Sequence, residues 1–208
     1  MKRNALRIGS VVLLIMVLGS CASMKLENYR FSGAEDSFAT DFSENDGKLE
    51  LTPGASVENG VLHLNPIDGP SAAGIKYAYG MNSVTRFRVK VTSDGPELFY
   101  NMLVRFEGGH TRLATILRRQ NTHIFASENG ENVYNNFTES GYLRPGQWHD
   151  VVIILHNGEY RLFVDGRLRK TLTVPAELPR EGYANFEYHN EAWVDDLEIT
   201  KIDGFTVE

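Results

Sequence analysis

The sequence predicts an all-β domain, an antiparallel sandwich of two sheets, behind a short N-terminal targeting segment. Short runs rich in β-branched and aromatic residues recur between clusters of Gly, Pro, Asn and Asp, and long apolar stretches at helical spacing are absent. Residues 84–91 alternate between apolar and polar side chains, which is typical of a strand with one buried face. The 208 residues suit a single domain, and many short strands in one domain favour a sandwich.

The first twenty residues have the pattern of an export signal. Lys2, Arg3 and Arg7 precede an almost wholly apolar run over residues 8–18, which is shorter than the roughly 20 residues of a transmembrane helix. Leu18-Gly19-Ser20 then leads into Cys21, the only cysteine. This junction resembles the lipobox of bacterial lipoproteins, which implies cleavage before Cys21 and acylation of its thiol, for example with palmitate. A plain secretory signal with an incidental cysteine is the alternative.

The lipoprotein resemblance also implies a location. Ala22 and Ser23 follow the cysteine, where an Asp would favour retention in the inner membrane, so we expect an outer-membrane protein that faces the periplasm. The expected organisation is a signal peptide over 1–20, a lipid-anchored tether over 21–29 and a sandwich domain over 30–208. Without a second cysteine no internal disulfide forms, so stability must come from the core, helped by a metal ion if one binds.

The charge balance argues against nucleic-acid binding. Three of the 21 basic residues and none of the 27 acidic residues precede Cys21, so the remainder has 18 basic against 27 acidic side chains. Nucleic-acid affinity is dominated by attraction between basic side chains and phosphates. An acidic domain therefore predicts other partners.

Thirteen strands are predicted in the domain. Asn157-Gly158 and Asp165-Gly166 have the residue pairs that type I′ hairpin turns prefer, and each separates two of these strands. The predicted strands are 37–42, 49–52, 61–65, 74–79, 83–91, 98–106, 112–119, 123–127, 148–156, 160–164, 168–174, 183–188 and 194–201.

Three stretches together resemble concanavalin A-like jelly-roll sandwiches. Residues 57–64 (VENGVLHL) are similar to an early strand of that fold. Residues 146–153 (GQWHDVVI) and 158–166 (GEYRLFVDG) resemble the hairpin of laminin-G-like domains. Residues 182–189 (GYANFEYH) are similar to a closing segment of the 3-keto-disaccharide hydrolase family. The resemblance implies a jelly-roll fold and a glycan-related function.

A catalytic signature is missing from the sequence. Laminarinase-type glucanases place E-x-D-x-x-E on a concave strand, but the nearest match, residues 44–50 (ENDGKLE), is one residue too long and contains turn residues. No G-x-S-x-G, H-E-x-x-H or phosphate loop is present. The sequence therefore leans against an enzyme. Glu187 and His189, two apart on one predicted strand, are the weak catalytic candidates. The alternative is a solvated edge pair, or a His that hydrogen-bonds to a neighbouring strand.

Candidate ligand-binding residues follow from strand alternation. Asn101 and Arg105 share one face of the predicted strand 98–106 with Leu103, and Arg118 on the next strand is expected nearby. Two arginines on one face would suit an acidic or hydroxyl-rich ligand, although a solvated surface is the alternative. Trp148 and Trp193 are predicted to pack in or against the core.

Asp195 is the candidate metal ligand. Residues 194–199 (VDDLEI) resemble the final strand of laminarinase-type sandwiches, in which the Asp coordinates a structural Ca²⁺. Alternation points Asp195 inward with Leu197 and Ile199, where a carboxylate needs a cation, an Arg or backbone amides as its partner. No organic cofactor is expected.

Three functions remain open at this point. The first is a lipid-anchored protein that binds a glycan on its concave sheet. The second is a glycan-processing hydrolase or lyase of the 3-keto-disaccharide hydrolase type. The third is a structural envelope protein that binds another protein.

Overall fold

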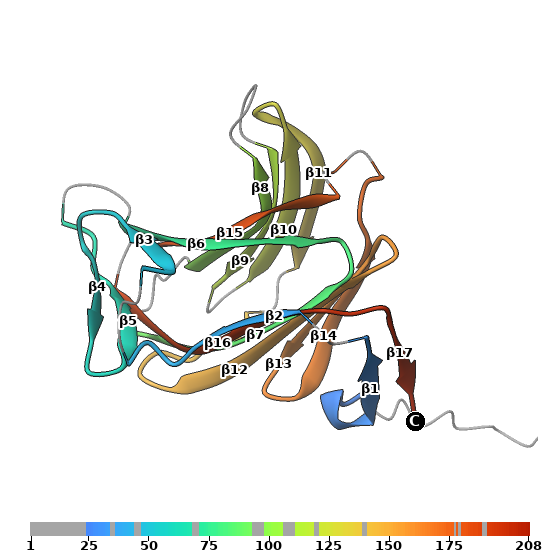
Figure 1. Ribbon diagram of the computed structural model, residues 1–208, viewed down its shortest axis with the longest axis horizontal. Helices are drawn as coiled ribbons and strands as arrows, with labels where there is room; N and C mark the ends of the chain where they lie inside the picture. The colour runs from blue at the N-terminus through green and yellow to red at the C-terminus, as the bar shows by residue number, and fades with distance from the viewer. Residues whose placement is uncertain are drawn as a thin grey trace, which may run out of the picture.

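Two antiparallel sheets packed face to face form a sandwich in the computed structural model (Figure 1). The jelly-roll prediction is therefore confirmed, and the described residues contain no helix long and apolar enough to cross a membrane. The structure describes residues 24–33, 36–43, 47–67, 71–92, 98–105, 111–118, 121–138, 141–176, 178, 180–188 and 191–208.

The seven-stranded sheet has strands from both halves of the chain. Its order is β11-β10-β9-β8-β15-β6-β3, so β15 from the end of the chain lies between two earlier strands. All of its neighbours are antiparallel. Its strands are β3 (Leu49–Leu51), β6 (Ser71–Gly80), β8 (Leu98–Arg105), β9 (Thr111–Leu117), β10 (Thr122–Glu128), β11 (Glu131–Thr138) and β15 (Glu181–Tyr188).

The eight-stranded sheet contains the laminin-G-like hairpin. Its order is β14-β13-β12-β7-β16-β5-β4, and β2 also pairs with β16. Its strands are β2 (Ser37–Thr40), β4 (Ala55–Glu58), β5 (Val61–Leu64), β7 (Ser83–Val91), β12 (Trp148–His156), β13 (Glu159–Val164), β14 (Arg167–Thr173) and β16 (Ala192–Lys201).

The two ends of the described chain pair with each other outside the sandwich. A short 3₁₀ helix, η1 (Leu26–Asn28), leads into β1 (Tyr29–Ser32), which pairs antiparallel with β17 (Gly204–Val207). Tyr29 packs edge-on against Phe163, with ring centroids 5.1 Å apart. Figure 1 shows this ribbon on the side of the eight-stranded sheet that faces away from the seven-stranded sheet. Residues 25–29, expected to be tether, are part of the fold.

The core lies between the two sheets and contains a chain of buried hydroxyl groups. The Tyr100 hydroxyl lies 3.4 Å from that of Tyr79 and donates to Thr85 Oγ1 at 3.3 Å. The Tyr160 hydroxyl lies 2.8 Å from Thr115 Oγ1. Burial raises the pKa of Tyr100 to about 12 and that of Tyr79 well above its usual value. These phenols therefore stay neutral, and their mutual hydrogen bonds offset the cost of burying them.

The hairpin predictions are confirmed by the backbone. Asn157 and Gly158 have φ of 49° and 76°, and Asp165 and Gly166 have 52° and 70°, as a type I′ turn requires. Strands were found near all thirteen predicted positions. The four strands missed were β1, β4, β11 and β17, which are short or largely exposed and so lack the apolar signal of a buried strand.

A bulge in β8 interrupts its alternation. Leu103 has φ of 55° and the register against β9 shifts between Met102 and Arg105. Met102 and Leu103 consequently both lie in the core cluster, although they are adjacent. Gly182 of β15 lies directly against this bulge, and a Cβ there would be 2.5 Å from the Leu103 carbonyl carbon.

Replacing Gly182 should therefore destabilise the sandwich strongly. Gly182→Ala puts a methyl group against backbone that cannot move independently, and we expect a loss of roughly 3 kcal/mol in the free energy of unfolding. Gly130→Ala is the matched control, because Gly130 has φ of 85° but open space around it; it should cost only about 1 kcal/mol of left-handed strain. Urea unfolding measures both, and equal losses would contradict the proposed close contact.

Candidate functional site

Four polar side chains meet on the face of the seven-stranded sheet that is turned away from the core. Asn101 of β8 donates through Nδ2 to Asn185 Oδ1 at 2.6 Å and to Glu187 Oε2 at 3.5 Å. Arg112 of β9 donates through Nη1 to Asn101 Oδ1 at 3.3 Å and lies 3.6 Å from Glu187 Oε2. We call these four residues the polar cluster. Asn101 is fully buried, whereas the side chains of Arg112 and Glu187 are about a quarter exposed.

The polar cluster lines a groove of about 370 Å³. Cross-strand register explains the convergence, because Asn101 is paired with Asn185 on one side and with Ala114 on the other. Directly opposed residues of neighbouring strands point to the same face. Val104, Phe125 and Ser127 complete the walls together with Gly130 and Asn132 at the β10–β11 hairpin.

Aromatic rings flank the polar cluster on its β10–β11 side. The Arg112 guanidinium lies over the Phe125 ring, 5.2 Å from its centroid. His123 lies beside Phe125, with centroids 5.3 Å apart, and meets Phe137 edge-on at 6.0 Å. The His123 Nε2 atom also contacts Asn135 Oδ1. Phe137 is 56% exposed, which leaves its ring available to a ligand.

The groove continues on the other side of the polar cluster. A second section of about 590 Å³ is lined by residues of β3, β6, β8 and β15, and it shares Val104 and Asn185 with the first section. Tyr183 lines this section and is 51% exposed. Its floor is open because Ala72 and Gly74 of β6 carry little or no side chain. An elongated ligand could thus cross the polar cluster from Tyr183 to Phe125.

The structure brings two of the predicted site residues together. Asn101 and Glu187 meet in the polar cluster. Arg118 lies beyond the end of β9, six residues along the chain from Arg112, and donates to Asn121 Oδ1 at 3.1 Å. The side chain of Arg105 and all of His189 lie outside the described residues.

Arg112 was not singled out from the sequence, because the sequence does not fix the register of β8 with β9, which pairs Asn101 with Ala114 and leaves Arg118 beyond Leu98. Uniform alternation put Leu103 and Arg105 on the Asn101 face, but Leu103 lies in the core and Val104 lines the groove instead. Alternation counted from Asn101 therefore does not extend past the bulge to Arg105, whose role stays a prediction. The signal that could have found Arg112 is that it shares a face with Arg118 on the predicted strand 112–119.

Among the described residues that line the groove, Glu187 has no second carboxylate on either strand beside β15. Retaining glycosidases need two carboxyl groups about 5–5.5 Å apart. In the described part of both groove sections the carboxylates are Glu187 and Glu50, and β3, which carries Glu50, is two strand spacings, roughly 10 Å, from β15. Glu187 is instead positioned by Asn101 and Arg112 to accept hydrogen bonds. This arrangement suits recognition of hydroxyl groups.

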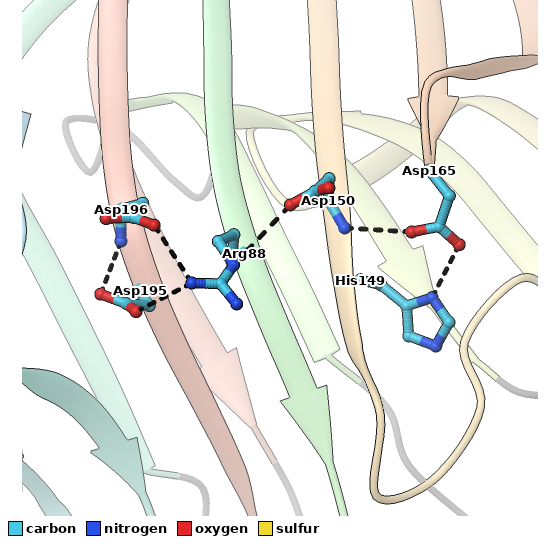
Figure 2. A network of polar contacts seen from close by, with 6 residues as sticks. All are labelled: Arg88, His149, Asp150, Asp165, Asp195 and Asp196. Carbon is cyan, nitrogen blue, oxygen red and sulfur yellow. Dashed lines mark hydrogen bonds and ion pairs between the residues drawn. The ribbon is translucent and has the colours of Figure 1, made fainter.

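A second polar network lies on the outer face of the eight-stranded sheet (Figure 2). Arg88 lies 3.5 Å from Asp195, 3.3 Å from Asp196 and 3.7 Å from Asp150. Its charge is therefore engaged by three carboxylates of the protein itself. In this network one guanidinium faces three carboxylates, whereas the polar cluster pairs one guanidinium with one carboxylate.

His149 and Asp165 explain part of the laminin-G-like motif. The Asp165 Oδ2 atom lies 2.9 Å from His149 Nδ1, and Asp165 Oδ1 accepts from the Asp150 N–H at 3.2 Å. The His149 Nε2 atom accepts from the Arg144 N–H at 2.8 Å, so its proton is on Nδ1. The motif thus joins the loop before β12 to the β13–β14 turn. Its role is structural.

The predicted orientation of Asp195 is wrong because β16 also contains a bulge. The register against β7 shifts between Asp195 and Glu198, and Asp196 has φ of 49°. Asp195 consequently shares the outer face with Arg88, whereas Leu197 and Val194 are buried in the core. Its carboxylate also accepts from the Asp196 N–H at 2.9 Å. Arginine and backbone amide are thus its partners in the structure.

A calcium site at Asp195 stays a prediction. Asp195 and Asp196 supply carboxylate oxygens of the kind that Ca²⁺ prefers. However, the described residues contain no group of three or more His, Cys, Asp or Glu side chains placed to hold a metal ion.

The two tryptophans also lie on the outer face, so the core prediction for Trp148 is wrong. Lys90 lies between the rings, 5.3 Å from the centroid of Trp148 and 4.3 Å from that of Trp193. Arg88 lies 5.0 Å from the Trp148 centroid, and His63 stacks on Trp193 with the ring planes 3° apart. Both faces of the Trp193 ring are therefore covered. A sugar could stack on Trp193 only by displacing His63 or Lys90.

Comparison with known proteins places the chain in a family. The model of the concanavalin A-like lectin/glucanases superfamily matches residues 83–206, more than half of the chain, and the protein belongs to this superfamily. The sequence resemblance to that superfamily is thereby confirmed. Sequence comparison with curated proteins finds no match.

Solved structures with very different sequences share the fold. A β-glucanase from Bacillus licheniformis superposes with a TM-score of 0.63 at 12% identity, over 81% of this chain and 98% of that one. A galectin-like protein of unknown function from Bacillus subtilis gives 0.69 at 8% identity, over 84% and 98%. The carbohydrate-binding module CBM66 from Bacillus subtilis gives 0.55 at 9% identity, over 74% and 93%. At these identities the likeness establishes the fold alone.

The pKa of Asp195 predicts a pH-dependent effect of its removal. Burial raises that pKa above its usual value of 3.8, and the charge of Asp196 adds to the rise. Protonated Asp195 therefore stabilises the folded state below about pH 3.8, and this stabilisation is lost as the pH rises through the folded-state pKa. The free energy of unfolding of Asp195→Asn minus that of wild type should therefore be larger at about pH 7 than at about pH 3. The change between the two pH values should be less than about 1 kcal/mol, because the group is partly exposed. Urea unfolding in chelator at both pH values measures this, and the reverse order would contradict it.

The predicted calcium site is tested on the same pair of proteins. If Ca²⁺ binds at Asp195, it should raise the melting temperature of the wild type above that in chelator, because a ligand of the folded state stabilises it by mass action. Asp195→Asn should abolish that difference. Superimposable wild-type melting curves in the two buffers would mean that Arg88 and the Asp196 amide hold the carboxylate alone.

Proposed function

We propose that the protein binds a glycan in the groove of its seven-stranded sheet. The observation that carries this proposal is the polar cluster, flanked by the exposed ring of Tyr183 on one side and by Phe125 and Phe137 on the other. Amide, carboxylate and guanidinium groups hydrogen-bond to hydroxyl groups, while flat rings stack on the apolar faces of sugars.

The charge of the groove favours a neutral, hydroxyl-rich glycan over a polyanion. Arg112 has Glu187 at 3.6 Å, so the two charges largely cancel at the centre of the polar cluster. An anionic ligand would have to compete with Glu187 for the guanidinium. A hydroxyl group can donate to the carboxylate and accept from the guanidinium without breaking the pair.

Membership of the superfamily supports a carbohydrate-related function. The solved structures that share the fold include a β-glucanase and a carbohydrate-binding module. The polar cluster lies on a sheet face, as binding to an extended glycan requires, and on its β6 side the groove continues into the second section.

A glycan-processing hydrolase is the alternative that one observation favours. Glu187 is a carboxylate held in a groove by Arg112 and Asn101, and His189 follows two residues later in the sequence. Hydrolysis of a bound glycan that is lost in Glu187→Gln would promote this alternative over binding alone. The absence of a second nearby carboxylate among the described groove residues makes binding the better proposal.

We further propose that acylation of Cys21 anchors the domain in the cell envelope, on the periplasmic side of the outer membrane. The basic start, the apolar run over residues 8–18 and the small residues before Cys21 support this. A single acyl chain holds a protein only marginally, whereas two or more anchor it stably, so a diacylated Cys21 suffices.

Truncating Arg112 should weaken glycan binding. With the body of the protein, residues 22–208, a glycan array identifies a ligand, and calorimetry then measures its affinity. Arg112→Ala removes hydrogen bonds of a charged donor in a partly desolvated groove, at a cost of about 1.5–3 kcal/mol, roughly a tenfold to hundredfold loss. Tyr183→Ala, which removes an exposed ring, should also lower the affinity without lowering the melting temperature.

Arg86→Ala is the matched control for Arg112→Ala. Arg86 is also a strand arginine with a glutamate partner, Glu198 at 3.3 Å, but it lies on the eight-stranded sheet. Its loss should leave the affinity unchanged. If Arg112→Ala and Tyr183→Ala both fold and bind the glycan as wild type does, the groove is not the binding site.

Removing the thiol of Cys21 should release the protein from the membrane. Cys21→Ser cannot be acylated, so the variant should appear in the soluble fraction or persist as an uncleaved precursor. Fractionation followed by mass spectrometry of the N-terminus distinguishes these forms. A processed Cys21→Ser protein that stays with the membrane would contradict the lipobox interpretation.

A further inference from the structure

The chain is fixed to the sandwich from Met24 onward. The Met24 carbonyl accepts from the Leu168 N–H at 2.9 Å, and the Leu26 N–H donates to the Gly166 carbonyl at 2.9 Å. Lys25 pairs between them with Arg167 in an antiparallel bridge. The chain therefore meets the domain at the β13–β14 turn, which the Asp165-Gly166 pair forms.

The distance from this turn to Cys21 is short. Two residues, Ala22 and Ser23, separate Cys21 from Met24, and the three steps from Cα to Cα span at most about 11 Å even when fully extended. If Cys21 carries the lipid, as proposed above, the β13–β14 turn cannot lie far from the membrane surface. No long linker is available to let the domain turn over.

Three basic side chains lie at the same point, together with the exposed carboxylates of Glu27 and Asp165. Lys25, Arg167 and Arg144 are exposed. Arg144 lies near the β13–β14 turn because its backbone N–H donates to His149, and His149 contacts Asp165 of the turn. Lys25 pairs with Glu27, whereas the side chains of Arg144 and Arg167 have no acidic partner among the described residues. Guanidinium groups of this kind bind phosphate groups well.

The groove lies on the opposite side of the molecule. Figure 1 shows η1, β1 and β17 below the eight-stranded sheet, with β8, β9, β10 and β11 above it. The sheets of a sandwich are about 10 Å apart, and the polar cluster lies on the far face of the second sheet. The face that meets the membrane and the face that carries the groove are therefore separated by the whole core.

We propose that the β13–β14 turn, with Lys25, Arg144 and Arg167, is the surface that rests on an anionic phospholipid bilayer, and that the groove is presented away from it. This inference depends on the proposed lipid anchor. It adds a fixed orientation that the anchor alone does not supply. A glycan bound in the groove would then be separated from the membrane surface by the whole domain and would not lie among the lipid headgroups.

Fluorescence quenching in vesicles tests the orientation. Acylation consumes the only native thiol, so one cysteine introduced into the full-length acylated protein can be labelled alone with an environment-sensitive dye. Gln147→Cys, exposed beside Arg144, reports on the proposed membrane surface, and Val133→Cys, exposed on β11, is the matched distal control. The protein is reconstituted into vesicles of phosphatidylcholine and phosphatidylglycerol that contain a lipid with a nitroxide-labelled headgroup.

Quenching at Gln147→Cys should exceed quenching at Val133→Cys severalfold. Equal quenching at the two positions, with the protein still bound to vesicles, would overturn the orientation and leave the anchor intact. If the full-length wild type is found to carry no acyl group and does not bind vesicles, the proposed anchor is overturned, and this inference with it. Glycan affinity of the soluble body is independent of both results.

A charge-reversal variant tests whether Arg144 and Arg167 contact the lipid headgroups. Arg144→Glu combined with Arg167→Glu should lower quenching at Gln147→Cys on vesicles with phosphatidylglycerol, because the reversed charges are repelled by anionic headgroups. The same variant on vesicles of phosphatidylcholine alone should show a smaller change. Unchanged quenching on both would mean that these arginines do not contact the headgroups.

Discussion

The candidate site depends on one backbone contact, the close approach of β15 to the bulge of β8. Gly182 permits this approach because it has no Cβ, and Leu103 fills the core from a left-handed backbone conformation. Beyond the bulge, Val104 faces outward and lies between the two sections of the groove. On the near side, Asn101 remains in register with Asn185. The polar cluster and the junction of the two groove sections at Val104 therefore result from the same bulge.

The two outer faces of the sandwich use similar side chains in different ways. On the eight-stranded sheet, Arg88 is surrounded by carboxylates and Trp193 is enclosed between Lys90 and His63. On the seven-stranded sheet, Tyr183 and Phe137 are more than half exposed. Aromatic rings that other side chains cover stabilise the sheet, and rings that are left exposed can stack on a ligand. Residue type alone does not distinguish the two cases.

The fold was predictable because its signals are local. The Asn157-Gly158 and Asp165-Gly166 pairs determine two turns through their own backbone preferences, and alternation over β7 determines which face is buried. The site was only partly predictable, because it depends on parity along β8 and β16. A bulge of one residue reverses which of the following side chains face the core. The residues around Leu103 and Asp196 carry no sequence pattern that predicts such a bulge. Asn101 lies before its bulge and was assigned correctly, whereas Asp195 lies at its bulge and was not.

The pairing of β1 with β17 has a consequence for how the domain can be joined to others. Tyr29 lies opposite Val207, so the first and last described strands leave the sandwich side by side. A domain with adjacent ends can be inserted into a loop of another protein, or followed by a second domain, without being pulled open. Any segment fused after Glu208 would start beside η1, on the far side of the molecule from the groove. A reporter attached there should leave the groove unobstructed.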